Sequence, residues 1–359
     1  MTVENIIGKF SIEGKVASIK PLGEGFINDT FIVKTEGDAP DYILQRKNHI
    51  VFPDVPAMMD NIVRVTEHIK AKVADPMRET LTVVPATDGK YYFRDENGNY
   101  WAVCVFIPDS VTYDKADTLE LARQGGIGIG RFQTLLADFT EPLAETIKGF
   151  HNIRFRFQQW DESLKADKAG RVKDLAEEIS WIESRREKML AFWELVENGT
   201  LPTRVTHNDT KLSNILFDKK TGKVLCAIDL DTAMSSTSLN DVGDALRSYT
   251  NTGAEDDPDL SKVSMDINIF QAYIDGYLSE RRDTLTPVEI EYLAFSGLYI
   301  TYEQVLRFLM DYIDGDTYYK IKSADHNLVR TRAQYKLLCS MEEQYPRMQE
   351  IVKNLAAAR

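Results

Sequence analysis

Two short β-prone runs around a polar turn, framed by acid and amide side chains, constrain this chain more than any other feature. The runs are residues 215–217 and 224–228, and residues 218–223 form the polar stretch between them. β-branched and aromatic residues favour strands and a Gly favours the turn, so the pattern predicts a buried β-hairpin. A hairpin symmetric about this turn returns Asp229 to the level of Asn214.

The side chains next to this hairpin are those that phosphoryl transfer needs. A protein that catalyses this reaction orients an acceptor hydroxyl, holds Mg²⁺ against phosphates and places positive charge near the transferred group. Asp209 is the candidate acceptor of the hydroxyl proton, and Lys211 is the candidate contact to the γ-phosphate. Asn214 and Asp229 offer the hard oxygen ligands that Mg²⁺ prefers. His207, in the same loop, is predicted to support the backbone through hydrogen bonds.

A solvated loop followed by a helix cap is the alternative interpretation of this motif, because Asp, Asn and Lys are common turn residues. The apolar runs on both sides indicate buried strands, and acids that frame a buried hairpin need a partner. The spacing therefore favours a kinase.

Charge and cysteine usage exclude several other classes of protein. The 359 residues carry a formal net charge of −13, with a pI near 5.0, which disfavours binding to a nucleic-acid backbone. Cys104, Cys226 and Cys339 lack metal-ligand spacing and are predicted to be buried thiols of a reducing compartment. No apolar run reaches the length of a membrane span, and the N-terminus lacks a signal-peptide pattern. We therefore predict a cytoplasmic protein without a nucleic-acid, membrane or obligate protein partner.

The chain changes character near residues 107–110. Before that point, short β-prone runs alternate with turn clusters, and one helical pattern spans residues 55–72. After it, the pattern is almost wholly helical except for the hairpin. The sequence therefore predicts a β-rich nucleotide-binding lobe over residues 1–108 and an α-rich catalytic and substrate-binding lobe over residues 109–359.

A two-lobed layout of this order places a nucleotide in the cleft between the lobes, with a hinge that meets the adenine edge. Val105, Phe106 and Ile107 lie at the predicted hinge. Gly23 and Gly25 stand between the first two strands, where main-chain amides can approach phosphate oxygens. An ordinary hairpin turn is an equally good explanation of this Gly pair from sequence alone.

The Gly-rich run at residues 125–130 looks like a phosphate loop, but its context differs. Apolar residues before and after it continue one helical pattern, and no strand precedes it. Glycine lowers helix stability, so we predict that another element packs closely against this helix.

Residues 207–214 together with residues 228–231 resemble the catalytic and metal-binding segments of the aminoglycoside phosphotransferase-like branch of the protein-kinase-like superfamily. Further segments are similar to the bacterial N-acetylhexosamine 1-kinases, and this similarity runs nearly end to end. These segments are residues 42–45, 51–54, 204–212, 307–312 and 326–332.

This resemblance implies an α+β, bilobal protein-kinase-like fold of the aminoglycoside phosphotransferase type. It also implies a kinase, dependent on ATP and Mg²⁺, that phosphorylates the anomeric hydroxyl of N-acetylglucosamine or N-acetylgalactosamine. Asp209 matches the catalytic base of that family, and Asn214 and Asp229 match its metal ligands. Asp231 is a candidate for a second metal, with a solvated or capping acid as the alternative. Asp241 matches an acid that braces the catalytic loop, and we predict a structural role for it.

The chain departs from the superfamily pattern in the third strand, which usually presents a Lys or Arg to the α- and β-phosphates. The aligned position holds Gln45, and Arg46 and Lys47 fall on other faces or beyond the strand. Arg46 is the predicted substitute, with Lys211 and Mg²⁺ as alternative carriers of the phosphate charge. In the superfamily, a carboxylate on the helix after this strand usually pairs with the strand cation. This chain has no clear match for it, since Glu67 of the helical pattern at residues 55–72 is predicted to lie on a solvated face.

The candidate sugar contacts lie in two segments. Arg307 and Asp311 are four residues apart on a predicted helix that starts near residue 286, so they share a face. An ion pair between them is one interpretation; the resemblance favours the other, in which Arg307 donates to sugar oxygens and Tyr312 stacks nearby. In the first hairpin, Phe26 stands where the family has a His, and Asn28 follows it as a second candidate contact.

Two other classes of function stay open. One is a kinase of another small alcohol, such as homoserine, choline or an aminoglycoside, because these enzymes share the acid motif. A strongly acidic cleft would favour such a cationic substrate. The other is a nucleotide-binding pseudokinase, which only the missing strand lysine supports.

Overall fold

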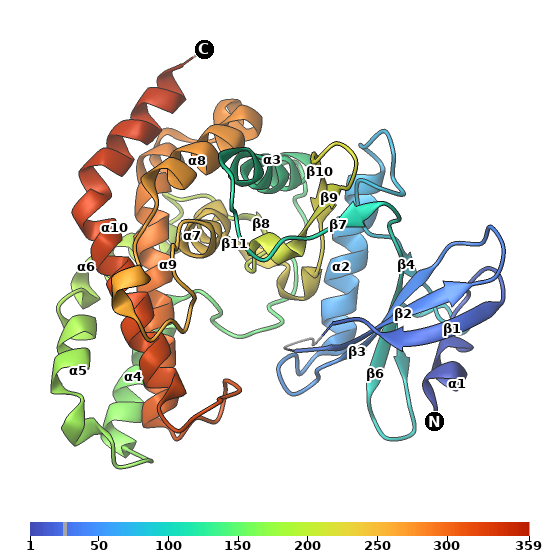
Figure 1. Cartoon of the computed structure of the whole chain (residues 1–359), viewed down its shortest axis with the longest axis horizontal. Coiled ribbons are helices and arrows are strands. Elements are labelled where there is room, and N and C mark those ends of the chain that lie inside the picture. The colour runs from blue at the N-terminus through green and yellow to red at the C-terminus, as the bar shows by residue number, and fades with distance from the viewer. Residues whose placement is uncertain (24–26, 359) are drawn as a thin grey trace. The chain divides into compact units, whose positions relative to one another are not determined.

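The structure is a computed structural model that describes residues 1–23 and 27–358 (Figure 1). It has the predicted α+β organisation, with a β-sheet in the N-terminal part and helices in the C-terminal part. The first compact unit comprises Met1–Val111, Asp138–Lys148 and Leu216–Ser235, and the second comprises Thr112–Ala137, Gly149–Ile215 and Ser236–Arg359. The predicted division after residue 108 lies close to the first boundary, whereas the two later returns of the chain to the first unit were not predicted.

The first unit is built on an antiparallel six-stranded sheet with the strand order β1-β2-β3-β6-β4, in which β5 pairs with β6. The elements of this sheet and the two helices of the unit match the alternating pattern of the first hundred residues. They are α1 (Val3–Ile7), β1 (Val16–Pro21), β2 (Asp29–Thr35), β3 (Tyr42–Lys47), α2 (Val55–Lys70), β4 (Val83–Val84), β5 (Phe93–Arg94) and β6 (Tyr100–Val105).

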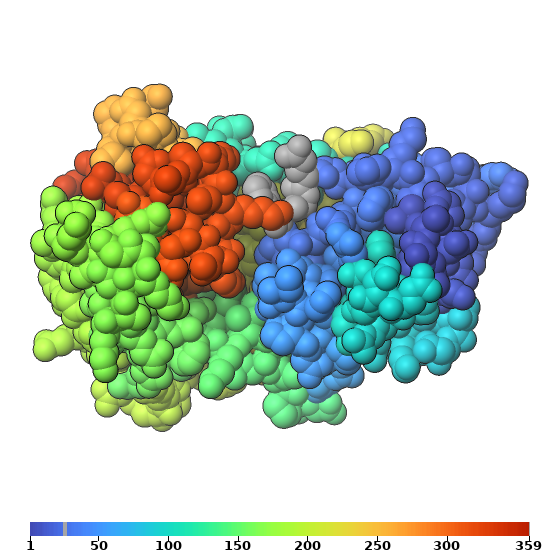
Figure 2. Space-filling model, turned by 90° about the horizontal axis from the view of Figure 1, so that it is seen from below, coloured from blue at the N-terminus to red at the C-terminus, as the bar shows by residue number. Residues whose placement is uncertain are grey.

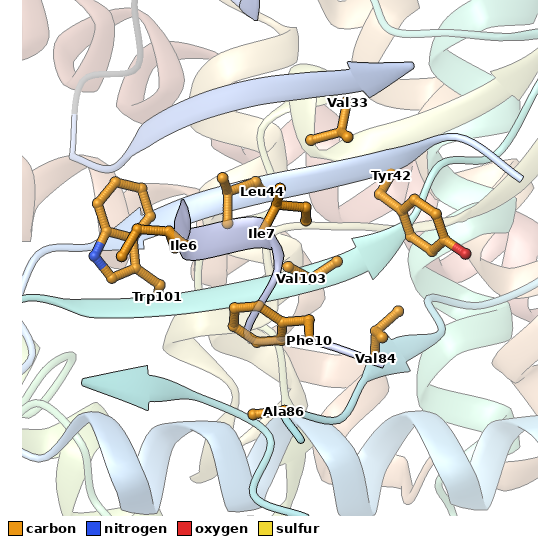
Figure 3. Packing of buried hydrophobic residues seen from close by; sticks show 10 residues of the cluster. All are labelled: Ile6, Ile7, Phe10, Val33, Tyr42, Leu44, Val84, Ala86, Trp101 and Val103. Carbon is orange, nitrogen blue, oxygen red and sulfur yellow. The ribbon is translucent and has the colours of Figure 1, made fainter. Parts of the chain in front are cut away.

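One face of this sheet carries the hydrophobic core of the unit (Figure 3). Ile6 and Ile7 of α1 pack with Leu44 of β3 and Val103 of β6, and these side chains are almost completely buried. Burial of such aliphatic side chains contributes about 1.5–3 kcal/mol each. Successive side chains of a strand point to opposite faces of the sheet, so every second residue of β3 faces this core and the residues between them face the other side.

The predicted hairpin is present. Strands β9 (Ile215–Asp218) and β10 (Val224–Ala227) pair, and β7 (Ser110–Val111) continues the sheet beside β9. Asp218 Oδ1 accepts hydrogen bonds from the backbone of the turn, and Gly222 adopts a φ of +69°, which a side chain would strain. The short elements η3 (Leu230–Thr232) and β11 (Met234–Ser236) follow β10 along the chain.

The second unit is mainly helical. The helices surround a short strand and a 3₁₀ turn that carry the candidate catalytic loop. The elements are α3 (Leu119–Leu135), α4 (Ile153–Ala166), α5 (Ala176–Glu183), α6 (Arg186–Glu197), β8 (Arg204–Thr206), η2 (Leu212–Asn214), α7 (Ser238–Tyr249), α8 (Ile267–Arg281), α9 (Pro287–Ile313) and α10 (His326–Ala357).

The Gly-rich run lies inside α3, as predicted, and packs closely against α8. A Cβ on Gly126 would stand 2.1 Å from the carbonyl oxygen of Tyr273, and a Cβ on Gly276 would stand 2.0 Å from that of Arg123. The two helix backbones approach each other because neither helix carries a side chain at these positions. The run serves helix packing.

The long helix α9 begins near residue 286, as predicted, and its first turn has a capping box. The Thr286 side chain accepts from the Glu289 backbone, while the Glu289 side chain accepts from the Thr286 backbone, which satisfies two N–H groups of the first turn. At the edge of this unit, Trp181 of α5 stacks on Tyr335 of α10 with ring centroids 3.8 Å apart. Figure 2 shows the green and red-orange segments to which these residues belong side by side at the surface.

All three cysteines are free thiols; Cys226 is buried, as predicted, whereas Cys104 and Cys339 are only partly buried. Over the described part of the chain, every helix is too short or too polar to cross a lipid bilayer.

Candidate active site

The loop between β8 and η2 is buried and is held by α7, which lies beside β8 (Figure 1). Asp241 of α7 accepts hydrogen bonds from the backbone N–H groups of His207 and Asn208, at 3.1 and 2.7 Å. Asp244, one turn further along α7, accepts from the N–H of Thr210 at 2.8 Å. Three N–H groups of one loop are therefore fixed by two carboxylates. These bonds support the structural role predicted for Asp241.

The loop brings Asp209, Lys211 and Asn214 together. Lys211 Nζ and Asn214 Nδ2 each lie 2.9 Å from Asp209 Oδ2, and Asn214 Nδ2 also donates to the Asp209 carbonyl. Burial opposes ionisation of Asp209, but the Lys211 ammonium and the surrounding donors outweigh it and lower the pKa of this carboxyl. Among the described residues, none donates to Asp209 Oδ1. The side chain is 26% exposed, so an acceptor hydroxyl can reach this oxygen.

Asp229 and Asp231 follow the hairpin in the first unit. Asp229 adopts a left-handed backbone conformation with φ of 59°, which Asp tolerates better than most residues. Asp231 is buried, and both of its oxygens are occupied: Oδ1 lies 2.7 Å from Lys47 Nζ, and Oδ2 lies 2.7 Å from Asn28 Nδ2. Asn28, a predicted sugar contact, thus holds Asp231 here.

Lys47 was predicted to lie on another face of the strand or beyond its end, and this prediction is wrong. Lys47 is the last residue of β3, its side chain is only 4% exposed, and its ammonium also donates to Gln45 Oε1 at 2.7 Å. Burial disfavours the charge, but Asp231 and Asp229 outweigh it and raise the pKa of Lys47. When β3 is extended to Lys47, the alternation of side chains along a strand puts Gln45 and Lys47 on the same face. This alternation is the sequence signal that was missed.

Arg46, the predicted substitute, points to the opposite face of β3. Its side chain is half exposed and pairs with Asp29. The buried cation of this strand is therefore Lys47, and the predicted phosphate contact of Arg46 stays untested.

Helix α2 supplies no carboxylate to Lys47 in the described residues. Glu67 forms an ion pair with Lys70 at the surface, in agreement with the predicted solvated face. Asn61 is a buried polar residue of α2, and its amide bonds to the backbone of Ala144 and Ala233. Asn61 thus ties α2 to the two later segments of its own unit.

The structure describes some, but not all, of the residues that were predicted to contact the nucleotide. The N–H of Val105 donates to the Thr82 carbonyl and that of Phe106 to the Asp41 carbonyl, so neither is available to a nucleotide. The N–H of Ile107 meets no acceptor among the described residues, and it is the remaining donor at the predicted hinge. Gly23 has a φ of +69°, and a Cβ added there would meet no atom of the described residues within 4 Å, its chain neighbours aside. Gly25 and Phe26 lie outside the described residues.

Arg307 of α9 lies among aromatic rings. Its guanidinium carbon is 5.3 Å from the ring centroid of Phe150 and 5.7 Å from those of both Tyr318 and Tyr319. No described residue accepts a hydrogen bond from it. The predicted alternative of an ion pair with Asp311 is wrong, because Asp311 instead accepts from three backbone N–H groups of residues 317–319. Arg307 therefore keeps its donors available.

Tyr312, the other predicted sugar contact on α9, lies on a different side of the helix. Its ring covers the guanidinium of Arg171 at 4.1 Å, and its carbonyl accepts from the same side chain. Tyr319, beside Arg307, is the better placed aromatic residue for an acceptor at that cation.

Magnesium fits the chemistry of the predicted ligands. Asn214 uses its Nδ2 on Asp209, so its Oδ1 meets no donor within the described chain and is presented as a hard ligand. The described residues contain no group of three or more His, Cys, Asp or Glu side chains suited to a metal. A metal here would depend on few protein ligands plus phosphate oxygens, which is the usual way that proteins bind Mg²⁺.

Comparison with known proteins identifies the family and the fold. The model of the APH phosphotransferase enzyme family matches residues 18–282. A microcompartment-associated aminopropanol kinase is similar, with a TM-score of 0.66, 16% identity, and 97% of this chain and 98% of that chain covered. A choline kinase from Cryptosporidium parvum has a TM-score of 0.58 and 15% identity, with 99% and 100% covered. A spectinomycin phosphotransferase in complex with ADP and spectinomycin has a TM-score of 0.55 and 12% identity, with 98% and 97% covered.

These solved structures share the kinase-like fold with this chain over nearly its full length. The family match begins inside β1 and includes the other strands of the first unit, the loop that carries Asp209, and the hairpin. Since the matched residues make up well over half of the sequence, the chain belongs to the APH phosphotransferase enzyme family.

Proposed function

We propose that this phosphotransferase is an ATP- and Mg²⁺-dependent kinase that phosphorylates the anomeric hydroxyl of N-acetylhexosamines to give the sugar 1-phosphate. Asp209 Oδ1 accepts the hydroxyl proton, the sugar oxygen bonds to the γ-phosphorus, and the bond from that phosphorus to the β-phosphate oxygen breaks to release ADP. Asn214 and Asp229 would hold Mg²⁺, which neutralises phosphate charge when bound. Lys211, which lies against Asp209, would reach the transferred group.

The use of a nucleotide is supported by the family and by a solved relative. The spectinomycin phosphotransferase of the same fold was solved with ADP. In this chain, Lys47 supplies a buried cation on the strand where kinases present one to the phosphates. The pseudokinase hypothesis was supported only by the apparent absence of a lysine in the third strand. That absence came from predicting the end of β3 too early, so the hypothesis loses its main support.

The choice of a sugar depends on Arg307. A guanidinium whose donors are uncommitted, framed by aromatic rings, suits an acceptor with many neutral hydroxyl and carbonyl oxygens. Tyr319 adds a flat apolar surface on which a sugar face can stack. An amino alcohol or an aminoglycoside carries its own positive charge, which this cation would repel.

A kinase of a small amino alcohol is the second candidate, and the similarity to the aminopropanol kinase and the choline kinase favours it. Those enzymes act, by their names, on cationic alcohols. The two candidates differ in what they require at Arg307, because only the neutral acceptor gains from a nearby guanidinium.

The proposal is tested by coupled measurement of ADP release over a panel of acceptors: N-acetylglucosamine, N-acetylgalactosamine, glucosamine, galactose, choline, ethanolamine, aminopropanol and homoserine. We expect the two N-acetylhexosamines to give the highest kcat/KM. Arg307→Met should raise KM for the sugar at least about tenfold, since it removes donors to the acceptor. Higher kcat/KM for a cationic alcohol, together with a gain in the Met variant, would refute the sugar and support the second candidate.

A further inference from the structure

A buried histidine outside the sequence motif contacts the loop that carries Asp209. His151 precedes α4 and is 7% exposed. Its Nε2 lies 3.1 Å from the carbonyl oxygen of Asn208, and its Nδ1 lies 2.7 Å from Glu303 Oε2 on α9. These partners come from segments 57 and 152 residues away in sequence.

Both ring nitrogens of His151 face acceptors. A carbonyl oxygen can only accept a hydrogen bond, and an ionised carboxylate can only accept as well. A neutral imidazole has one N–H and would satisfy just one of these two contacts. Both contacts are hydrogen bonds only when the ring carries two protons and is positively charged.

The surroundings keep Glu303 ionised, so that the second proton belongs to the ring. Burial disfavours the carboxylate, but His151, Arg307 and Arg156 outweigh it and lower the pKa of Glu303. Arg156 Nε lies 3.4 Å from Glu303 Oε1. For His151, burial likewise opposes the charge, and Glu303 together with its hydrogen bond outweighs burial and raises the pKa of the ring.

The groups that face this ring come from three helices. Glu303 and Arg307 lie on α9, Arg156 lies on α4, and Asp244 on α7 adds further negative potential at the ring. Tyr299 of α9 donates to the His151 carbonyl at 2.7 Å, which fixes the backbone of the residue.

The contact falls on a backbone position that directs Asp209. Asn208 has a φ of 66°, a conformation that costs free energy for a residue with a side chain. The peptide between Asn208 and Asp209 is held at both ends, because His151 donates to its carbonyl oxygen and the His207 ring accepts from its N–H at 3.3 Å. The orientation of this peptide sets the direction in which the Asp209 side chain leaves the loop.

We propose that His151 is a positioning residue that, as an imidazolium anchored by Glu303, holds the peptide bearing Asp209 in its working orientation. The inference rests on the proposed function, in which Asp209 is the base. The contribution of the charged ring is fully present below the ordinary histidine pKa of about 6.5 and is lost as the pH rises through the raised value. Neutral His151 keeps only one of its two hydrogen bonds.

Two variants separate the two contacts. His151→Gln places an amide donor near the position of Nε2 and keeps a bond to the Asn208 carbonyl. His151→Asn places the donor near Nδ1 and keeps only the contact with Glu303. We expect kcat to fall about tenfold or more in the Asn variant, with KM for ATP within about twofold of the wild type, since a small misplacement of a reacting group is costly.

The Gln variant should keep most of the wild-type kcat and lack the decline of kcat that we expect of the wild type as the pH rises through the raised pKa of His151. His68→Gln, at a partly exposed position of α2 that contacts Asp138, is the matched control and should keep the wild-type pH profile. Equal losses of thermal stability in the Gln and Asn variants, with kcat unchanged in both, would mean a merely structural role and would overturn the proposal.

A measurement without substrate keeps this test separate from the proposed function. The chain has five histidines, so imidazole nitrogen signals of the uniformly ¹⁵N-labelled full-length protein can be assigned by their loss in the Gln variant. We expect two protonated ring nitrogens for His151 at pH 7 and a shifted Asp209 amide signal in the Asn variant alone. A neutral ring at pH 7, or an Asp209 amide that does not respond, overturns the inference. If no alcohol is phosphorylated, the proposed function fails while these signals still decide the role of His151.

Discussion

Among single residues, Asp209 is informative because the two oxygens of its carboxylate have different environments. Oδ2 is held by Lys211 and Asn214, so the side chain cannot rotate freely, while Oδ1 receives no donor from the described residues. A general base needs this combination of a fixed orientation and an accessible oxygen.

Asp209→Asn should therefore lower kcat by about 10²–10⁴-fold, because an amide cannot take the hydroxyl proton. Binding of ATP, measured by calorimetry, should stay within about threefold of the wild type, since this carboxylate serves the acceptor alcohol rather than the nucleotide. Asp60→Asn on the exposed face of α2 is the control and should change neither quantity. Turnover at the wild-type rate in the Asp209 variant would remove this residue from the mechanism.

Lys47 and Arg46 are adjacent in sequence, but their environments differ in a way that stability can measure. Lys47→Met leaves Asp231 buried without its cation, which should lower the free energy of unfolding by about 3–5 kcal/mol. Arg46→Met removes an exposed ion pair and should cost about 0–1 kcal/mol. Urea denaturation of both variants gives these values, and similar losses would contradict the assignment of Lys47 as the buried cation.

The same pair of variants tests the nucleotide contact. KM for ATP should rise in the Lys47 variant and stay within about twofold in the Arg46 variant. The opposite result would restore the prediction made from sequence for Arg46.

Residues of the site differ in how far sequence could predict them. Asp209 and Asn214 lie in one short motif, and the structure joins them as that motif indicates. Lys47 was missed because the end of its strand was placed too early, and strand alternation then gave the wrong face. His151 gave no local signal, since its partner Glu303 is 152 residues away and only the folded chain shows that both ring nitrogens meet acceptors.

At the scale of elements, local patterns predicted the helices and the hairpin well. The capping box at Thr286 marks the start of α9, and the apolar spacing of residues 55–72 matches α2. These signals depend on a few neighbouring residues, so they can be read without tertiary contacts. The glycines of α3 were also interpreted correctly, because a helical pattern on both sides outweighed their resemblance to a phosphate loop.

The close packing of α3 on α8 requires a residue without a side chain at Gly126, and a substitution can test this requirement. A Cβ there would stand 2.1 Å from the Tyr273 carbonyl oxygen and 2.8 Å from the Tyr277 backbone nitrogen, and backbone atoms cannot move aside as a side chain can. Gly126→Ala should lower the free energy of unfolding by about 1–3 kcal/mol, despite the better helix propensity of Ala.

Gly8→Ala is the matched control, because the nearest atom to its Cβ would lie 3.6 Å away and its φ is −66°. Denaturation should show a change within about 0.5 kcal/mol for this variant. If both variants unfold at the same denaturant concentration, the close approach of α3 and α8 is not a constraint on the fold.

At the scale of the whole molecule, the sequence predicted two successive lobes, and the units of the structure are not successive. Residues 138–148 and 216–235 return to the first unit, so the hairpin belongs to a different unit from the loop that precedes it. Composition changes along the chain reveal the first boundary near residue 110 but not these returns, because a local pattern predicts the structure of a segment and not the unit against which it packs. The predicted metal ligands Asn214 and Asp229 consequently belong to different units.

Their shared role is a proposal that thermal unfolding can test. A ligand that binds only the folded protein adds about 2.7 kcal/mol of stability at one hundred times its Kd, so saturating ATP with Mg²⁺ should raise Tm. Removal of Mg²⁺ with EDTA should reverse the metal-dependent part of this rise. Asn214→Ala and Asp229→Asn should each abolish that part, and Asn at residue 229 retains tolerance of the left-handed backbone.

The double variant distinguishes one shared ion from two separate sites. If Asn214 and Asp229 hold the same Mg²⁺, the double variant loses no more metal-dependent stabilisation than either single variant, because the ion is already lost. Independent sites would give losses that add. Asp60→Asn on α2 should keep the full metal-dependent increment, and the Tm of each variant without ligand corrects for changes in intrinsic stability. Additive losses, or an ATP effect that EDTA leaves unchanged, would contradict the assignment of these two residues to one magnesium ion.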